Sequence, residues 1–230
     1  VQTCALPIWG ILVDSFNIYR DIAERTQGDI YVGVVGPVRT GKSTFIKKFM
    51  DTMVIPKINN TYKKERAKDE LPQSGSGKTI HTTEPKFVPN EAIEITIDDD
   101  VNFKVRLIDC VGYIVKGALG YLEDDEPKMV NTPWYEYEIP FEDAAEIGTR
   151  KVITDHSTIG LLVTTDGSIT GLAREDYVEA EERVVEELKS INKPFVVVLN
   201  TKNINSPETE ILKKWSWKEI WRNSTGYGCI

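Results

Sequence analysis

The sequence has few cysteines and histidines, no long apolar run and too few basic residues to balance its acidic ones. Its three cysteines, at positions 4, 110 and 229, are too few and too scattered for a disulfide framework or a zinc site. We therefore expect the protein to reside in the reducing cytoplasm. No stretch approaches the roughly 18 apolar residues of a membrane-spanning helix. The formal net charge of −8 argues against nucleic-acid binding, because such proteins need a basic surface to displace counterions.

The two ends of the chain differ in character from its middle. The sequence starts without Met or the basic residues that begin a signal peptide, and we expect residues 1–14 to be a non-native or disordered extension. In the tail, 206–230, three Trp crowd among lysines at positions 215, 217 and 221. A basic amphipathic helix on a membrane surface is one interpretation, but we favour an out-of-frame tail, since the three Trp form no clean helical face. Residues 15–205 remain as one domain.

Short apolar runs alternate with amphipathic segments through this domain. The segments 29–36, 92–97, 103–108, 159–163 and 194–200 read as strands, and 43–53 and 174–191 as helices. The polar segment 59–84 is predicted to be a loop, and 112–148 to be irregular until a helix begins near Glu142. This alternation predicts an α/β fold, with a mostly parallel sheet and helices on both faces.

The loop between the first strand and the first helix carries a phosphate-binding motif. Glycines at its two ends let the backbone turn its N–H groups inward, and the following helix N-terminus adds partial positive charge. Lys42 can reach the β- and γ-phosphates, and the Ser43 hydroxyl can ligate Mg²⁺. Arg39 either contacts phosphate oxygens or is solvated or ion-paired. The residues of this P-loop are Gly36, Pro37, Val38, Arg39, Thr40, Gly41, Lys42 and Ser43.

A second motif, Asp-x-x-Gly, ends the predicted strand 103–108. Asp109 is placed to hold Mg²⁺ through water, and Gly112 to bring a backbone N–H to the γ-phosphate. GTPase-like proteins carry a switch threonine between the two motifs, and Thr82 and Thr83 both remain candidates for that contact with Mg²⁺ and the γ-phosphate. The spacing of the motifs predicts a P-loop nucleotide hydrolase of GTPase-like fold.

The base-binding and water-orienting positions depart from the GTPase pattern. Asn200 stands where GTPases begin Asn-Lys-x-Asp, but Thr201 replaces the Lys and Asn203 the Asp that accepts two N–H groups of guanine. Guanine selectivity should be lost, which favours ATP. Tyr113 occupies the position of the Gln that orients the attacking water, so we expect slow hydrolysis.

Beyond the two generic motifs, several segments resemble one particular family. They are residues 21–26, 33–50, 82–89, 131–135, 145–152 and 180–183. Together they resemble the stage IV sporulation protein A family of endospore-forming Firmicutes, over about residues 15–202. The resemblance implies a P-loop ATPase domain related in fold to translation-factor GTPases, with Lys42 and Ser43 as Walker A residues, Asp109 on the Mg²⁺ side and Thr82 and Thr83 as sensors.

The resemblance also implies a role. Such a protein is a morphogenetic ATPase of the mother-cell cytoplasm that self-assembles at the outer forespore surface as the base layer of the spore coat. Its implied partners are further copies of itself, a small amphipathic forespore-membrane peptide and other coat morphogenetic proteins, so that it meets the membrane surface only indirectly. The alternative is a GTPase-like regulatory switch that does not polymerise.

Overall fold

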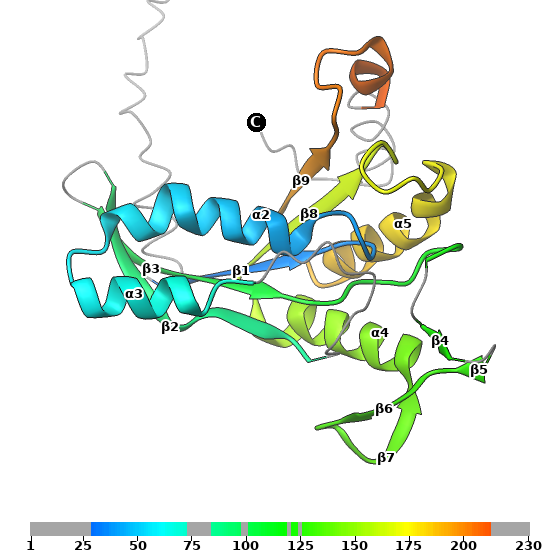
Figure 1. The fold of residues 1–230 in the computed structure, drawn as a ribbon, viewed down its shortest axis with the longest axis horizontal. Coiled ribbons are helices and arrows are strands. Elements are labelled where there is room, and N and C mark those ends of the chain that lie inside the picture. The colour runs from blue at the N-terminus through cyan, green and yellow to red at the C-terminus, as the bar shows by residue number, and fades with distance from the viewer. Residues whose placement is uncertain (1–28, 73–83, 98–100, 119–120, 124–125, 213–230) are drawn as a thin grey trace, which may run out of the picture.

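A five-stranded sheet in the order β2-β3-β1-β8-β9 forms the centre of the protein (Figure 1). The computed structural model describes residues 29–72, 84–97, 101–118, 121–123 and 126–212. The extension 1–14, Thr82, Thr83 and the three Trp of the tail lie outside the described residues.

The strands of the central sheet are β1 (Asp29–Val35), β2 (Lys86–Ile97), β3 (Val101–Asp109), β8 (Ile159–Thr165) and β9 (Phe195–Asn200). β1 pairs in parallel with β3 and β8, and β8 with β9, whereas β2 runs antiparallel to β3. The five predicted strands are confirmed, as is the pairing of the second with the third. In a sheet of this kind, parallel strands end at one edge, and ligands bind there.

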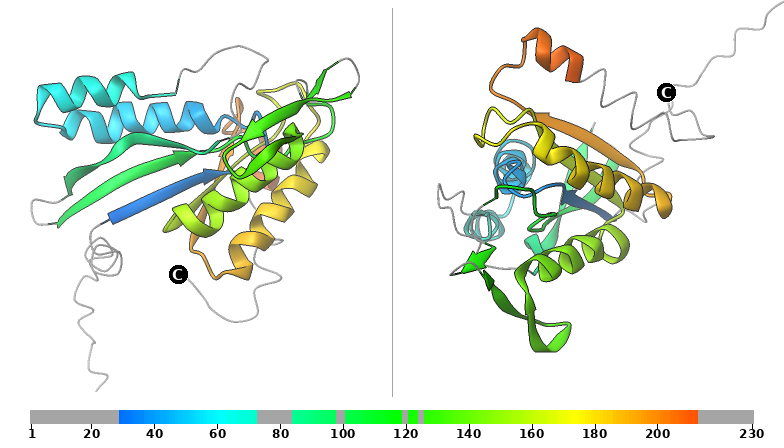
Figure 2. Two further views of the ribbon diagram at one scale, coloured as in Figure 1. Left: turned by 90° about the horizontal axis from the view of Figure 1, so that it is seen from below. Right: turned by 90° about the vertical axis from the view of Figure 1, so that its right-hand side faces the viewer.

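Alternate residues of β1 supply two separate cores. Val34 packs with Ile46 against one face of the sheet, and Val35 packs with Val184 against the other. The first face is covered by α2 (Lys42–Phe49), the short helices Met50–Val54 and Ile55–Lys57, and α3 (Thr61–Asp69). The second is covered by α4 (Phe141–Lys151), its extension Val152–His156, and α5 (Glu175–Ser190) (Figure 2). The prediction of helices on both faces is confirmed.

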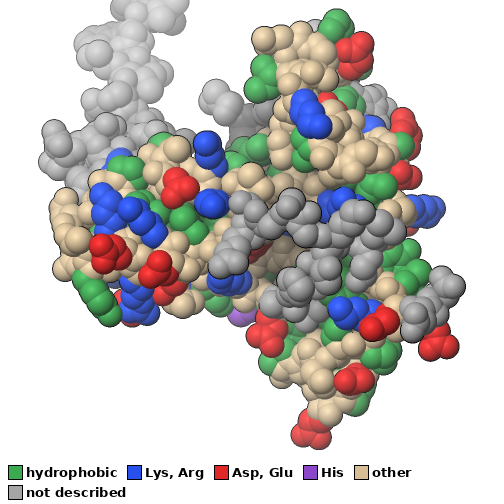
Figure 3. Space-filling view, in the orientation of Figure 1, with side chains coloured by type: hydrophobic (Ala, Val, Ile, Leu, Met, Phe, Trp, Pro, Cys, Tyr) green, Lys and Arg blue, Asp and Glu red, His purple; other side chains and the backbone are tan. Residues whose placement is uncertain are grey.

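The prediction of a loop throughout 59–84 is wrong in its first part, because α3 forms there. Its sequence is so charged that little apolar periodicity is visible, yet the side chain of Asn60 caps the helix by accepting from the Lys63 N–H at 3.0 Å. Ala67 and Leu71 bury their side chains in the first core. Figure 3 shows basic and acidic side chains interspersed over the surface formed by α2 and α3.

The segment between β3 and β8 is more regular than predicted. It holds two small hairpins, formed by β4 (Leu122–Glu123) with β5 (Glu126–Pro127) and by β6 (Met129–Thr132) with β7 (Tyr135–Pro140). The helix expected near Glu142 begins at Phe141. Among the described residues, no helix is long and apolar enough to cross a membrane.

Candidate functional site

The P-loop adopts the turned backbone that its glycines permit. Gly36 and Gly41 have φ angles of 134° and 93°, and Arg39, with an exposed side chain, has a φ of 63°. A φ of this sign is uncommon for a residue other than glycine, and such backbone strain gathers at functional sites. Gly41 is also the N-cap of α2, so the loop leads directly into a helix N-terminus, as anion binding requires.

Lys42 is folded against the loop that precedes it. Its Nζ donates to the carbonyl oxygens of Pro37 at 2.6 Å and Gly36 at 3.3 Å, and the side chain is buried. Burial lowers the pKa of Lys42, while Cys110 and Asp109 act in the opposite direction. A largely desolvated ammonium group at the mouth of the loop is a strong site for phosphate oxygens, since the low local dielectric strengthens the attraction.

Ser43 and Asp109 meet although 66 residues separate them. The Ser43 hydroxyl donates to Oδ2 of Asp109 at 2.6 Å. Oδ1 of Asp109 is buried and, within the described part of the chain, has no hydrogen-bond partner. Burial raises the pKa of Asp109, against the hydrogen bond from Ser43 and the charge of Lys42. A hydroxyl and a carboxylate with one free oxygen fit a Mg²⁺ ion, which takes oxygen ligands and keeps several waters.

Gly112, in the second motif, lies against the P-loop beside Lys42. With φ at 94°, an added Cβ would lie 2.1 Å from the Gly36 carbonyl oxygen and 2.6 Å from Lys42 Nζ, so only glycine fits. Tyr113 pairs with the P-loop as well, since its carbonyl accepts the Val38 N–H at 2.9 Å. The two motifs therefore meet around Lys42, as the spacing predicted.

The side chain of Tyr113 turns away from Lys42. It is buried, its hydroxyl donates to Glu187 of α5 at 2.5 Å, and the guanidinium of Arg183 lies 4.4 Å from the ring centroid. Burial raises the pKa of Tyr113, and the hydrogen bond to Glu187 raises it further. The group that follows Asp-x-x-Gly is thus a neutral hydroxyl committed to α5.

Asn200 contacts the P-loop from the end of β9. Its Nδ2 donates to the Thr40 carbonyl at 3.0 Å and lies 2.4 Å from where a Cβ of Gly41 would be. The Thr201 hydroxyl donates to Oδ2 of Asp166, at the end of β8, at 2.5 Å, and accepts the Asn203 N–H at 3.0 Å. The loops after β8 and β9 are therefore tied together beside the P-loop.

Two residues of this site had no role in the sequence-based prediction. Thr149 of α4 accepts the Gly112 N–H at 3.2 Å, and Asp166 anchors Thr201. Thr149 has no recognisable spacing from the motifs, whereas Asp166 follows the predicted strand 159–163 closely and could have been found on that ground, since ligands bind beyond the carboxyl ends of such strands. The structure brings Lys42, Ser43, Asp109, Gly112 and Asn200 together around the P-loop, and their roles in binding nucleotide remain predictions.

Comparison with known proteins gives a consistent result. The family described as "Stage IV sporulation protein A, ATPase domain" matches residues 13–220. Stage IV sporulation protein A of Clostridioides difficile (strain 630) is 64% identical over 197 residues, which are 86% of this chain and 40% of that protein. The Bacillus subtilis (strain 168) protein of that name is 60% identical over 202 residues, covering 88% of this chain and 41% of its own length.

The chain thus spans about two fifths of the length of these relatives. Among solved structures, a variant of SsGBP has a TM-score of 0.39 and 17% identity, covering 88% of this chain and 49% of its own. The P-loop α/β fold is established by the strand order and the motif geometry described above. With the match of 208 residues, these observations show that the chain belongs to the family of the ATPase domain of stage IV sporulation protein A.

Proposed function

We propose that this chain binds ATP with Mg²⁺ and hydrolyses it, as the ATPase domain of a protein that assembles the base layer of the spore coat. The observation that carries the nucleotide part is the meeting of Lys42, Ser43, Asp109 and Gly112 at the carboxyl edge of the sheet. The unpartnered Oδ1 of Asp109 supports a further ligand at this point. The family supports ATP hydrolysis as the reaction.

Each residue has a distinct task in this proposal. The N–H groups of the P-loop and the ammonium of Lys42 hold the phosphates, and Lys42 exchanges its carbonyl partners for phosphate oxygens. Ser43 and Asp109 hold the metal, directly and through water, while Thr82 or Thr83 completes the contact with the metal and the γ-phosphate. Bound Mg²⁺ supplies positive charge that neutralises the charge developing during transfer. Gly112 offers its N–H to the γ-phosphate.

Base selection is proposed to favour adenine. Asn203 follows Asn200, which is bonded to the P-loop, and donates its N–H to Thr201. It stands at the position where guanine recognition would require a carboxylate. An amide offers one acceptor and donors, so it does not match the two adjacent N–H groups of guanine as a carboxylate does.

Hydrolysis is proposed to be slow and to serve assembly. Tyr113 stands in place of a water-orienting Gln, and its hydroxyl is held by Glu187. A slow reaction fits one conformational or assembly step per nucleotide better than metabolic turnover. We therefore propose self-assembly in the mother-cell cytoplasm at the outer forespore surface, recruited by a small amphipathic membrane peptide and joined by other coat proteins.

The first experiment measures phosphate release from ATP and from GTP by the wild type and Lys42→Ala. We expect Mg²⁺-dependent release from ATP by the wild type and a loss of at least roughly a hundredfold in Lys42→Ala, since the main phosphate-binding charge is gone. Equal rates in the two proteins would rule out hydrolysis at this site. A clear preference for GTP would favour the regulatory switch over the assembly ATPase.

The base is tested with Asn203→Asp. The carboxylate restores two acceptors for guanine, so we expect GTP affinity to rise relative to ATP by roughly tenfold or more, the worth of one hydrogen bond to a charged group. Lys202→Ala, at the neighbouring exposed position, is the matched control and should leave the ratio unchanged. An unaltered ratio in Asn203→Asp would remove Asn203 from base recognition.

Assembly is tested by sedimentation of the whole protein with ATP, with ADP and without nucleotide. We expect large particles to accumulate with ATP in the wild type and not in Lys42→Ala. A purely monomeric protein under all conditions, with normal hydrolysis, would separate the ATPase from the proposed assembly role.

A further inference from the structure

The N–H of Gly112 has a partner inside the protein. Thr149, fully buried on α4, accepts this N–H at 3.2 Å, and its own hydroxyl donates to the Ala145 carbonyl at 2.8 Å. The Gly112 N–H, which we expect to contact the γ-phosphate, is therefore hydrogen-bonded to a hydroxyl of α4, a helix outside the nucleotide motifs.

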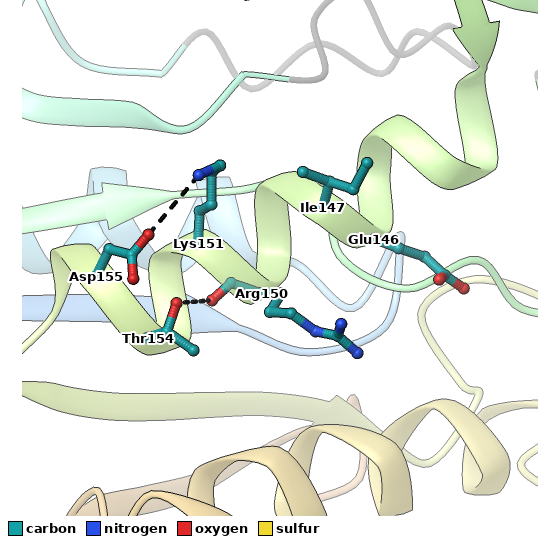
Figure 4. A pocket seen from close by; sticks show the side chains of 6 residues that line it. All are labelled: Glu146, Ile147, Arg150, Lys151, Thr154 and Asp155. Carbon is teal, nitrogen blue, oxygen red and sulfur yellow. Dashed lines mark hydrogen bonds and ion pairs between the residues drawn. The ribbon is translucent and has the colours of Figure 1, made fainter. Parts of the chain in front are cut away.

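The residue after Gly112 is held from the same side of the sheet. Tyr113 lies under the guanidinium of Arg183, which forms a paired contact with Glu146 of α4. The Tyr113 hydroxyl donates to Glu187, which also accepts a hydrogen bond from Arg150 at 3.3 Å. Figure 4 shows the side chains of Glu146 and Arg150 leaving α4, one turn apart. Because Gly112 carries no side chain, its peptide can turn while the side chain of Tyr113 stays anchored to α5.

Two acceptors then compete for one donor. Gly112 lies so close to Lys42 that its Cβ position is 2.6 Å from Nζ, so the Gly112 peptide lies beside the phosphate-binding group while its N–H points to Thr149. A backbone N–H donates one strong hydrogen bond, so the bond to Thr149 and a bond to the γ-phosphate exclude each other.

We propose that Thr149 is a positioning residue that lets the site distinguish a nucleoside triphosphate from a diphosphate. Its hydroxyl holds the Gly112 N–H when no γ-phosphate is bound and yields it when one arrives. The exchange turns the peptide at Gly112 and changes the contacts of α4, so the presence of the γ-phosphate is passed to that helix. The proposal rests on the proposed function, since it requires nucleotide at the P-loop.

The test compares the affinities of Thr149→Val and wild type for ADP and for a non-hydrolysable ATP analogue, both with Mg²⁺. Valine keeps the shape but accepts no hydrogen bond, so the buried Gly112 N–H lacks a partner unless a γ-phosphate supplies one. We expect the ratio of analogue affinity to ADP affinity to rise roughly tenfold. Thr149→Ser, which keeps the hydroxyl, should restore the wild-type ratio.

A purely structural role for Thr149 would weaken both nucleotides alike, so an unchanged ratio in Thr149→Val overturns the proposal. Thr149→Cys provides a second variant of similar size with a weaker acceptor, and its ratio should move in the same direction. Thermal unfolding of each variant confirms that it is folded. Failure of the proposed function is distinguishable, because the wild type would then bind neither nucleotide more tightly than Lys42→Ala does.

Discussion

Gly112 is the residue at which the demands of the site are most restrictive. Its φ of 94° and its approach to the Gly36 carbonyl oxygen leave no room for a side chain. Gly171 has a similar φ of 77°, but an added Cβ would meet nothing within 4 Å. The two glycines therefore separate the cost of backbone strain from the cost of a clash at the site.

For Gly112→Ala we expect hydrolysis to fall by on the order of a hundredfold, because the loop must move away from Lys42. Gly171→Ala should lose about 1 kcal/mol of unfolding free energy, from the left-handed backbone alone, and keep its rate. The measurements are phosphate release and urea unfolding. Similar rates in the two variants would mean that closure of Gly112 on the P-loop is not needed.

At the same scale, the site residues that could be predicted are those whose chemistry is written in a short stretch of sequence. Lys42 and Ser43 follow the glycines of a contiguous loop, and Asp109 precedes Gly112 by a fixed spacing. Thr149 could not be found in this way. Its hydrogen bond spans 37 residues, and a threonine within an amphipathic helix carries no sign of its partner.

Among the elements, α3 is a helix that apolar periodicity in the sequence could not predict. Six of its nine residues carry charged side chains, and Ala67 is the buried position among them. Local capping and an i,i+4 ion pair between Arg66 and Glu70, at 3.0 Å, supply what the apolar pattern lacks. β1, β8 and α5 were predicted because burial imposes a clear pattern on them, and β9 because its run of β-branched residues favours a strand. Ile191 was included in the predicted helix 174–191, but it lies exposed just beyond the end of α5.

The cap of α3 gives the prediction at this scale. Asn60→Ala removes the acceptor of the Lys63 N–H, and we expect a loss of about 1 kcal/mol of unfolding free energy. Asn60→Asp keeps an acceptor and should be close to wild type. Asn59→Ala, at the neighbouring exposed position, is the control. Urea unfolding decides the matter, and equal losses for Asn59→Ala and Asn60→Ala would show that the cap contributes nothing.

For the molecule as a whole, the strand order explains why motifs distant in sequence form one site. β1, β3, β8 and β9 run parallel, so the P-loop, Asp109, Asp166 and Asn200 all follow carboxyl ends at one edge of the sheet. The alternation of strands and helices predicted the mostly parallel sheet from which this edge follows. The ties that cross it, from Asn200 to the P-loop and from Thr201 to Asp166, depend on the packing of side chains.

Because the site is built from several strands, a bound nucleotide should stabilise the entire domain. A ligand at 100 times its Kd adds about 2.7 kcal/mol to the unfolding free energy, which for a chain of this size raises Tm by roughly 5–10 °C. We expect that rise with ATP and Mg²⁺, and a smaller one when EDTA removes the metal. The difference arises because Ser43 and Asp109 then lose their link to the nucleotide.

Asp109→Asn makes that test specific. The amide keeps the shape of the carboxyl group but not its charge, so the variant should still be stabilised by ATP and should lose most of its response to EDTA. Lys42→Ala should show little stabilisation under either condition, since the phosphates lose their main cationic contact. If EDTA lowered the Tm of wild type and Asp109→Asn equally, the metal would be held elsewhere, and the meeting of Ser43 with Asp109 would be structural only.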